Sequence, residues 1–155
     1  MLIARKTYNS KNLFTVSAHI EMIKNSNAYT DVAYLEFYQG FDQATKISMK
    51  VSTTTLRAIA FAMQELILTG ATEFKKINNS AQHSQQGGAK TLSFNVSNEG
   101  KYFLNLQQGE NEKRHFATDK YMFEAIAKDV ELISEETQKM LYITQQTNNK
   151  EENES

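Results

Sequence analysis

Two segments of this 155-residue chain share one pattern of apolar alternation followed by a glycine turn. Residues 34–40 read YLEFYQG, residues 103–109 read FLNLQQG, and each precedes a helix-like segment. Two further pairs match in the same order: RKTYNS (5–10) with KKINNS (75–80), and RAIAFAMQELI (57–67) with EAIAKDVELI (124–133). The offsets drift only from 67 to 70 residues, so the sequence predicts a unit that was built twice.

Hydrophobic periodicity predicts the content of each unit. Apolar residues alternate with polar ones over residues 14–22, 33–40 and 46–51, which is the period of a strand with one buried face. At Ser52 the period changes to that of a helix, which Ser52 or Thr53 caps and Gly70 ends. A second helix is expected to begin near Thr118 and either to continue or to restart after Ser134, through Met140 and Leu141. We therefore expect an α+β protein of two tandem ββββα repeats, with antiparallel sheets and both helices packed on one side.

The domain boundaries follow from composition. Residues 1–147 are expected to form one domain, whose repeats occupy about residues 1–70 and 71–141. The stretch NNSAQHSQQGGA (78–89) has no large apolar residue, so we expect a mobile loop there. Residues 148–155 are polar and acidic, and we expect them to form a flexible tail.

A four-stranded sheet that is covered by a helix on one side leaves its other side free, and function is expected there. Lysines and aromatic residues share the predicted free face. In the first repeat these are Tyr34, Tyr38, Lys46 and Lys50; in the second they are Lys101, Phe103, Lys113 and His115. Four further cations of the first strands are expected to contact phosphates: Arg5, Lys6, Lys75 and Lys76.

Charge is distributed unevenly, although the formal net charge is only −1. Residues 1–52 and 71–117 each hold six basic and four acidic residues, whereas residues 118–147 hold three and six. A basic sheet with exposed rings suits single-stranded nucleic acid, because cations attract phosphates and unpaired bases stack on rings. The alternative is a solvated sheet face whose edge lysines discourage aggregation.

Two tandem copies of four strands and a helix, over residues 3–141, resemble the Whirly family of single-stranded DNA-binding proteins. Their pseudo-dimer is similar to the dimer of the positive-cofactor transcriptional coactivators. The resemblance implies binding of single-stranded DNA with little sequence preference, helices that form the core, and assembly into homo-oligomers. The acidic tail resembles those of bacterial and phage single-strand-binding proteins, which implies contact with a replication or recombination protein.

Several other classes of function lack their sequence signals. The chain has no cysteine, no GxxxxGK[ST], GxGxxG, GxSxG or HExxH string, and three histidines without metal-ligand spacing. We therefore expect no enzyme, no metal and no cofactor. The absence of cysteine, of a signal-peptide core and of a long apolar run favours a cytoplasmic protein with no membrane contact.

The leading hypothesis is a non-catalytic single-stranded DNA-binding protein that acts in replication, recombination or transfer of a phage, plasmid or similar element. The alternative is a small protein-interaction or inhibitor module, whose acidic C-terminal helix and tail mimic nucleic acid. A third interpretation is a protein that binds RNA or double-stranded nucleic acid.

Overall fold

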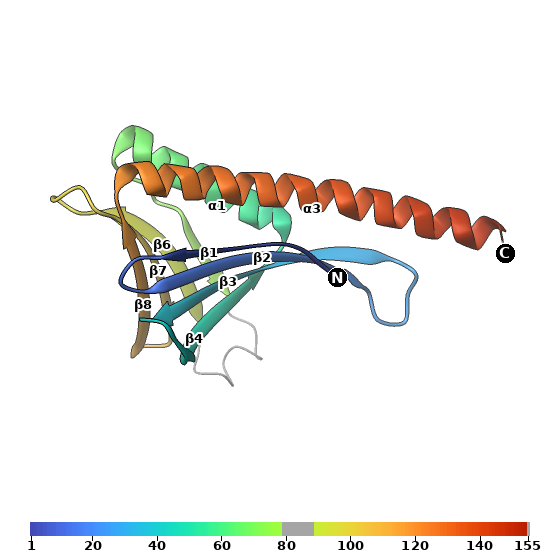
Figure 1. Ribbon diagram of the computed structural model, residues 1–155, viewed down its shortest axis with the longest axis horizontal. Coiled ribbons are helices and arrows are strands. Elements are labelled where there is room, and N and C mark those ends of the chain that lie inside the picture. Colours follow the sequence, from blue (N-terminus) through green and yellow to red (C-terminus); the bar gives the residue numbers. More distant parts are fainter. Residues whose placement is uncertain (79–88, 155) are drawn as a thin grey trace.

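The computed structural model describes residues 1–78 and 89–154, so most of the predicted 78–89 loop, with His83, lies outside the described residues. The first antiparallel sheet has the order β1-β2-β3-β4 and consists of β1 (Leu2–Asn9), β2 (Leu13–Met22), β3 (Tyr29–Gln39) and β4 (Asp42–Val51). The second has the order β5-β6-β7-β8 and consists of β5 (Lys75–Asn78), β6 (Lys90–Val96), β7 (Tyr102–Gln108) and β8 (Glu112–Thr118). Helix α1 (Thr53–Thr69) follows the first sheet and α3 (Lys120–Glu154) the second, which confirms the predicted tandem ββββα architecture (Figure 1).

Both helices begin at a side-chain cap in the same place of their repeat. The Ser52 hydroxyl accepts a 3.1 Å hydrogen bond from the Thr55 amide, and the Asp119 carboxylate accepts one of 2.8 Å from the Met122 amide. Such caps satisfy amides that have no partner within the helix. Helix α1 ends at Gly70, whose φ of 77° is the left-handed conformation that glycine adopts most readily. The predicted cap and end of the first helix are therefore confirmed.

The two helices lie side by side on one side of the sheets (Figure 1). They run antiparallel, because the end of α1 contacts an earlier part of α3 than the start of α1 does. Gln64, near the end of α1, donates a 3.0 Å hydrogen bond to Glu131. Arg57, near the start of α1, donates one of 2.9 Å to Gln138 further along α3. Within residues 1–78 and 89–154, the other side of each sheet carries no helix.

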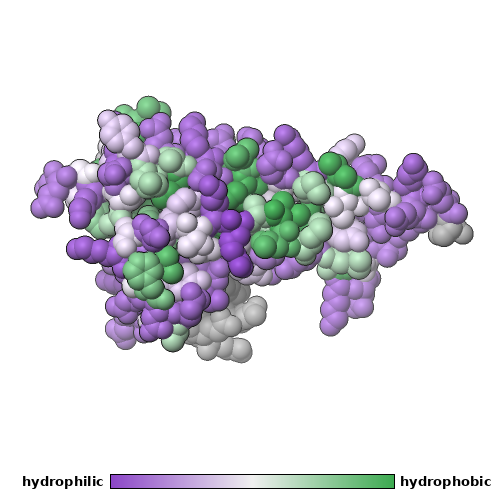
Figure 2. Space-filling view, in the orientation of Figure 1, coloured by the Kyte–Doolittle hydropathy of each residue, from purple (hydrophilic) through white to green (hydrophobic). Residues whose placement is uncertain are grey.

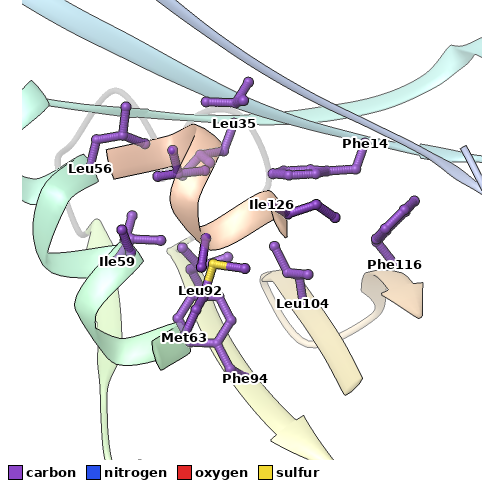
Figure 3. Close-up of a cluster of buried hydrophobic side chains, with 14 of the residues drawn as sticks. Phe14, Leu35, Leu56, Ile59, Met63, Leu92, Phe94, Leu104, Phe116 and Ile126 are labelled. Carbon is purple, nitrogen blue, oxygen red and sulfur yellow. The ribbon is translucent and has the colours of Figure 1, made fainter. Parts of the chain in front are cut away.

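One cluster of buried apolar side chains joins both repeats. Figure 3 shows side chains from the first sheet, the second sheet and both helices converging: Phe14, Leu35, Leu56, Ile59, Met63, Leu92, Phe94, Leu104, Phe116 and Ile126. The rings of Phe14 and Phe116, one from each sheet, lie 5.8 Å apart between centroids. The repeats thus share a single core, and burial of this apolar surface is the main stabilising contribution to folding.

Helix α3 extends well beyond its partner. It is continuous through Ser134, which is buried, and it reaches Glu154. The sequence prediction of a helix end near residue 141 is therefore wrong, because the polar residues after it continue the helix. Figure 2 shows that this outer end is hydrophilic, beyond a more apolar region in the middle of the helix. Gln145 and Asn148 attach it to the β2–β3 turn through hydrogen bonds with Asn27 of 3.2 and 2.8 Å.

The free edge of β4 is closed by side chains of the second sheet. Lys90 donates to the carbonyl of Ser48 at 2.5 Å, and Arg114 donates to the carbonyl of Thr45 at 2.9 Å. Asn78 donates to the carbonyl of a third β4 residue, Lys50, at 3.0 Å. Carbonyls that would otherwise form an open sheet edge are thereby paired, which makes addition of a further strand at β4 unfavourable.

Candidate nucleic-acid interface

The outer face of the first sheet carries five of the predicted cations and rings: Arg5, Tyr34, Tyr38, Lys46 and Lys50. Arg5, Tyr34 and Lys50 lie in one row across the sheet, since Arg5 and Tyr34 both pair with Ser17 and Tyr34 also pairs with Lys50. Lys46 points to the same side of β4, two positions before Ser48. Their neighbours along each strand point into the core, as the period of two requires. The face is thus placed as the sequence predicts.

The Tyr34 ring is already contacted by its neighbours. The Lys50 ammonium lies 5.9 Å from the ring centroid, within cation–π range, and the His19 ring meets Tyr34 edge-on at 5.6 Å. Burial, followed by the N-terminal ammonium, lowers the pKa of His19, so this ring is neutral at pH 7. Stacking of a base on Tyr34 would have to displace these contacts.

Acidic and buried groups further limit this face. The Lys46 ammonium forms a 3.1 Å ion pair with Glu36, whose side chain is largely shielded from solvent. Tyr38 points to the same face but is only 6% exposed. Burial, and then the Glu36 carboxylate, raises the pKa of Tyr38. The Tyr38 ring is therefore too buried to stack on bases, contrary to the prediction.

Two predicted phosphate contacts lie on the opposite side of their sheets. Lys6 pairs with Val16 on the helix side of β1, and its ammonium lies 3.6 Å from Asp129 of α3. Lys76 pairs with Leu92, whose side chain is in the core, and it lines a cleft at the start of α1 together with Glu21 and Asp31. Lys6 and Lys76 therefore do not lie on the helix-free faces with Arg5 and Lys75, because adjacent strand residues point to opposite sides.

The outer face of the second sheet is more uniform. Four of the predicted site residues lie at outward strand positions of this sheet: Lys75, Phe103, Lys113 and His115. Its full set of outward residues is Lys75, Ile77, Thr91, Ser93, Asn95, Phe103, Asn105, Gln107, Lys113, His115 and Ala117. This set contains cations, amides and hydroxyls but no carboxylate. Lys101 is exposed in the turn that leads into β7.

A chain of hydrogen bonds crosses this second face. The Asn105 amide nitrogen donates to Asn95 Oδ1 at 2.7 Å, and Asn105 Oδ1 accepts from His115 Nδ1 at 2.6 Å. The same three side chains line a shallow groove with Thr91, Ser93, Gln107 and Lys113. Hydrogen bonds of this kind fix the orientation of the amides before any ligand arrives.

The two outer faces do not form one continuous surface. The inward sides of both sheets meet at the shared core, and strands of the second sheet run steeply across the direction of β1 and β2 (Figure 1). The outward sides therefore point in different directions. The site residues predicted as one set separate into a first-sheet group and a second-sheet group.

Sequence reasoning overlooked the amides and hydroxyls of the second face. Asn95, Asn105 and Ser93 were not among the residues predicted to bind nucleic acid. The available signal was the alternation of Leu92 and Phe94 with Thr91, Ser93 and Asn95, which places the three polar residues on one side. The hydrogen bonds that join Asn95, Asn105 and His115 depend on the register of three strands, which alternation along one strand does not determine.

No metal-binding cluster of His, Asp or Glu occurs within residues 1–78 and 89–154. Neither described helix combines the length and the apolarity that crossing a bilayer requires. No protein-family model matches the chain, and no curated protein sequence is significantly similar to it. The geometry of the two faces therefore carries the functional argument.

Proposed function

We propose that this protein binds single-stranded DNA without catalysing a reaction, and that the outer face of the second sheet is its principal contact surface. The observation that carries the proposal is the composition of that face. Lys75, Lys113 and His115 share this face with Phe103, amides and hydroxyls, and no outward strand position of the second sheet carries a carboxylate. The tandem ββββα order on which the resemblance to Whirly proteins rests also supports this function.

The chemistry favours a single strand over a duplex. Unpaired bases expose their ring faces, and stacking on an aromatic side chain contributes about 1–3 kcal/mol per base. Duplex recognition commonly places a helix or a two-stranded ribbon in the major groove. Here both helices lie against the sheets, and the cations lie on the strands. A flat face with one half-buried ring suits a strand whose bases are already unpaired.

Binding of a fluorescently labelled oligothymidine of about 15 nucleotides, followed by anisotropy, tests the proposal. Affinity should fall steeply between about 50 and 200 mM salt, because bound cations displace counterions from the phosphates. Lys113→Glu should weaken binding about tenfold or more, and Lys46→Glu should weaken it less, since Lys46 is paired with Glu36.

The matched control is Lys128→Glu, the same charge change at an exposed position of α3. It should leave the affinity within about a factor of two, because Lys128 is on the helix side and charges beyond a Debye length are screened. Absence of binding in low salt, or equal losses in Lys113→Glu and Lys128→Glu, would refute the proposed surface.

The second candidate function is a protein-interaction module that mimics nucleic acid. Helix α3 favours it, because its exposed outer end holds Glu151, Glu152 and Glu154 but only one cation, Lys150. A regular helix places these carboxylates along a rod, as phosphates are placed along a strand. If the oligonucleotide does not bind, removal of residues 150–154 should abolish binding of the protein to a basic, nucleic-acid-binding partner.

A further inference from the structure

We propose that Asn95 and Phe103 form a site for one adenine base on the outer face of the second sheet. This inference rests on the proposed function and deepens it, because it adds a base preference to binding that is otherwise driven by phosphates. Asn95 and Phe103 are directly opposite each other on β6 and β7, with both side chains outward. Opposite side chains of this kind have their Cβ atoms about 5 Å apart.

Phe103 has an accessible ring, unlike its counterpart in the first repeat. The position opposite Phe103 on β8 is Ala117, whereas Lys50 occupies the corresponding position beside Tyr34. Lys50 covers the Tyr34 ring at 5.9 Å, and an alanine methyl group cannot cover Phe103 in that way. Within the described part of the chain, no aromatic ring or cation is recorded against Phe103. A base can therefore stack there.

The hydrogen-bond chain determines which atoms of Asn95 remain available. Asn105 donates to Asn95 Oδ1, so the Asn95 amide keeps both of its N–H groups and one oxygen lone pair. His115 contacts the other end of the Asn105 amide, and with both amides turned over Asn95 would still keep one N–H group and an oxygen lone pair. Asn95 itself is exposed and thus presents an adjacent donor and acceptor to solvent.

Adenine has the matching pattern on two of its edges. Its N6 amino group can donate to Oδ1 while N7, or N1 on the other edge, accepts from Nδ2; asparagine paired with adenine in this bidentate way is a common contact. Cytosine can pair with the amide through its amino group and ring acceptor on one edge only, and thymine can pair through N3–H and a carbonyl of that same edge only, whereas adenine offers two edges. A purine also gives the larger surface for stacking on Phe103.

The first sheet lacks such a site, although its strands have the same order. Glu36 occupies the position of Asn105, and a carboxylate has no N–H to donate and repels phosphates. Ser17 occupies the position of Asn95 and is only 1% exposed. The duplicated scaffold therefore carries the base site in one copy only.

Competition against the labelled oligothymidine tests the inference. Three unlabelled competitors of equal length are used: oligothymidine, oligocytidine and a repeat of thymine-thymine-adenine. The adenine-containing oligonucleotide should compete at a concentration about threefold or more lower than oligothymidine, because adenine can pair with Asn95 through either of two edges and stacks over a larger surface. Asn95→Ala should weaken competition by the adenine-containing oligonucleotide more than competition by oligothymidine, and so reduce this difference.

Asn111→Ala, at an exposed turn residue, is the matched control and should keep the preference. Phe103→Leu should weaken all three competitors, because it removes the ring and retains apolar bulk. Equal competition by the three oligonucleotides would overturn the adenine site while leaving single-strand binding intact. Loss of the preference in Asn111→Ala as well as in Asn95→Ala would also overturn it. Failure of the labelled oligothymidine to bind at all would instead refute the proposed function, and the adenine site with it.

Discussion

The hydroxyl of Tyr8 donates a 2.8 Å hydrogen bond to the Asp129 carboxylate, and so joins the first strand to the last helix across 121 positions of sequence. The Lys6 ammonium lies 3.6 Å from the same carboxylate. The Tyr8 ring stacks on Phe14 with 5.9 Å between centroids. This contact couples a polar network to the core at the edge of the first sheet.

Replacement of Tyr8 by Phe should lower the free energy of unfolding by about 1–2 kcal/mol, because a hydrogen bond to a charged, partly buried group is lost. The ring and its stacking on Phe14 remain, so the change isolates the hydroxyl. Urea denaturation measures the difference. Tyr142→Phe, at an exposed position of α3, should have little effect; equal losses would show that the Asp129 contact is not the cause.

Stability should fall above about pH 10, and Tyr8 should contribute to that fall. Burial, and then the Asp129 carboxylate, raises the pKa of Tyr8 above its ordinary value. The unfolded chain therefore loses the phenolic proton first, and the stability present below about pH 10 is lost as pH rises further. Burial lowers the pKa of Lys90, which acts in the opposite direction.

Urea midpoints at pH 8, 10 and about 11 compare the wild type with Tyr8→Phe and so isolate the tyrosine from other titrating groups. The variant should lose less stability over this range than the wild type. Parallel pH curves for the two proteins would contradict the prediction.

Lys75 and Lys76 are neighbours in sequence, but they should differ in their effect on DNA binding. Lys75 pairs with Ser93 on the outer face, whereas Lys76 pairs with the buried Leu92. Lys75→Gln should reduce the slope of log affinity against log salt by about 0.7, the value for one phosphate contact on a single strand. Lys76→Gln should leave the slope unchanged. Salt titrations by anisotropy measure both, and a reversed order would contradict the assignment of faces.

Much of this fold could be predicted from the sequence, because period-two alternation and helix caps are local signals. The same signals placed Tyr34, Lys46 and Lys113 on the free faces. The failures have a different physical origin. Whether an aromatic ring is buried depends on side chains from neighbouring strands, as at Tyr38. Which side of the sheet each side chain of an edge strand faces depends on the register of that strand.

The match of RKTYNS with KKINNS shows the register problem most clearly. It equates Lys76 with Lys6, yet the sheet pairings equate Lys76 with Tyr8. Tyr8 pairs with Phe14, which pairs with Phe37. In the second sheet, Lys76 pairs with Leu92, which pairs with Leu106. Phe37 and Leu106 occupy equivalent positions, because each lies three residues before a turn glycine. The match is thus displaced by two residues, which preserves the side of the sheet but not the neighbours.

Glu36→Gln should strengthen binding of single-stranded DNA. The change removes a negative charge from the outer face of the first sheet and releases Lys46 from its 3.1 Å ion pair, so that Lys46 can contact a phosphate. We expect a gain of about two- to fivefold in low salt, which corresponds to the energy of one exposed charge pair. Glu124→Gln, on an exposed position of α3, is the matched control and should have no effect on the anisotropy titration.

The outer part of α3 should hold the β2–β3 turn in place. Gln145 Oε1 accepts a 2.8 Å hydrogen bond from the Tyr29 amide, and Gln145 Nε2 donates to the Asn27 carbonyl at 3.2 Å. Gln145→Ala removes both contacts and should increase hydrogen exchange of the Tyr29 amide by about fivefold or more, since that amide loses its partner. Gln146→Ala, at the next and exposed position, serves as the control. If Tyr29 exchanges equally fast in both variants and in the wild type, the helix end does not order the turn in solution.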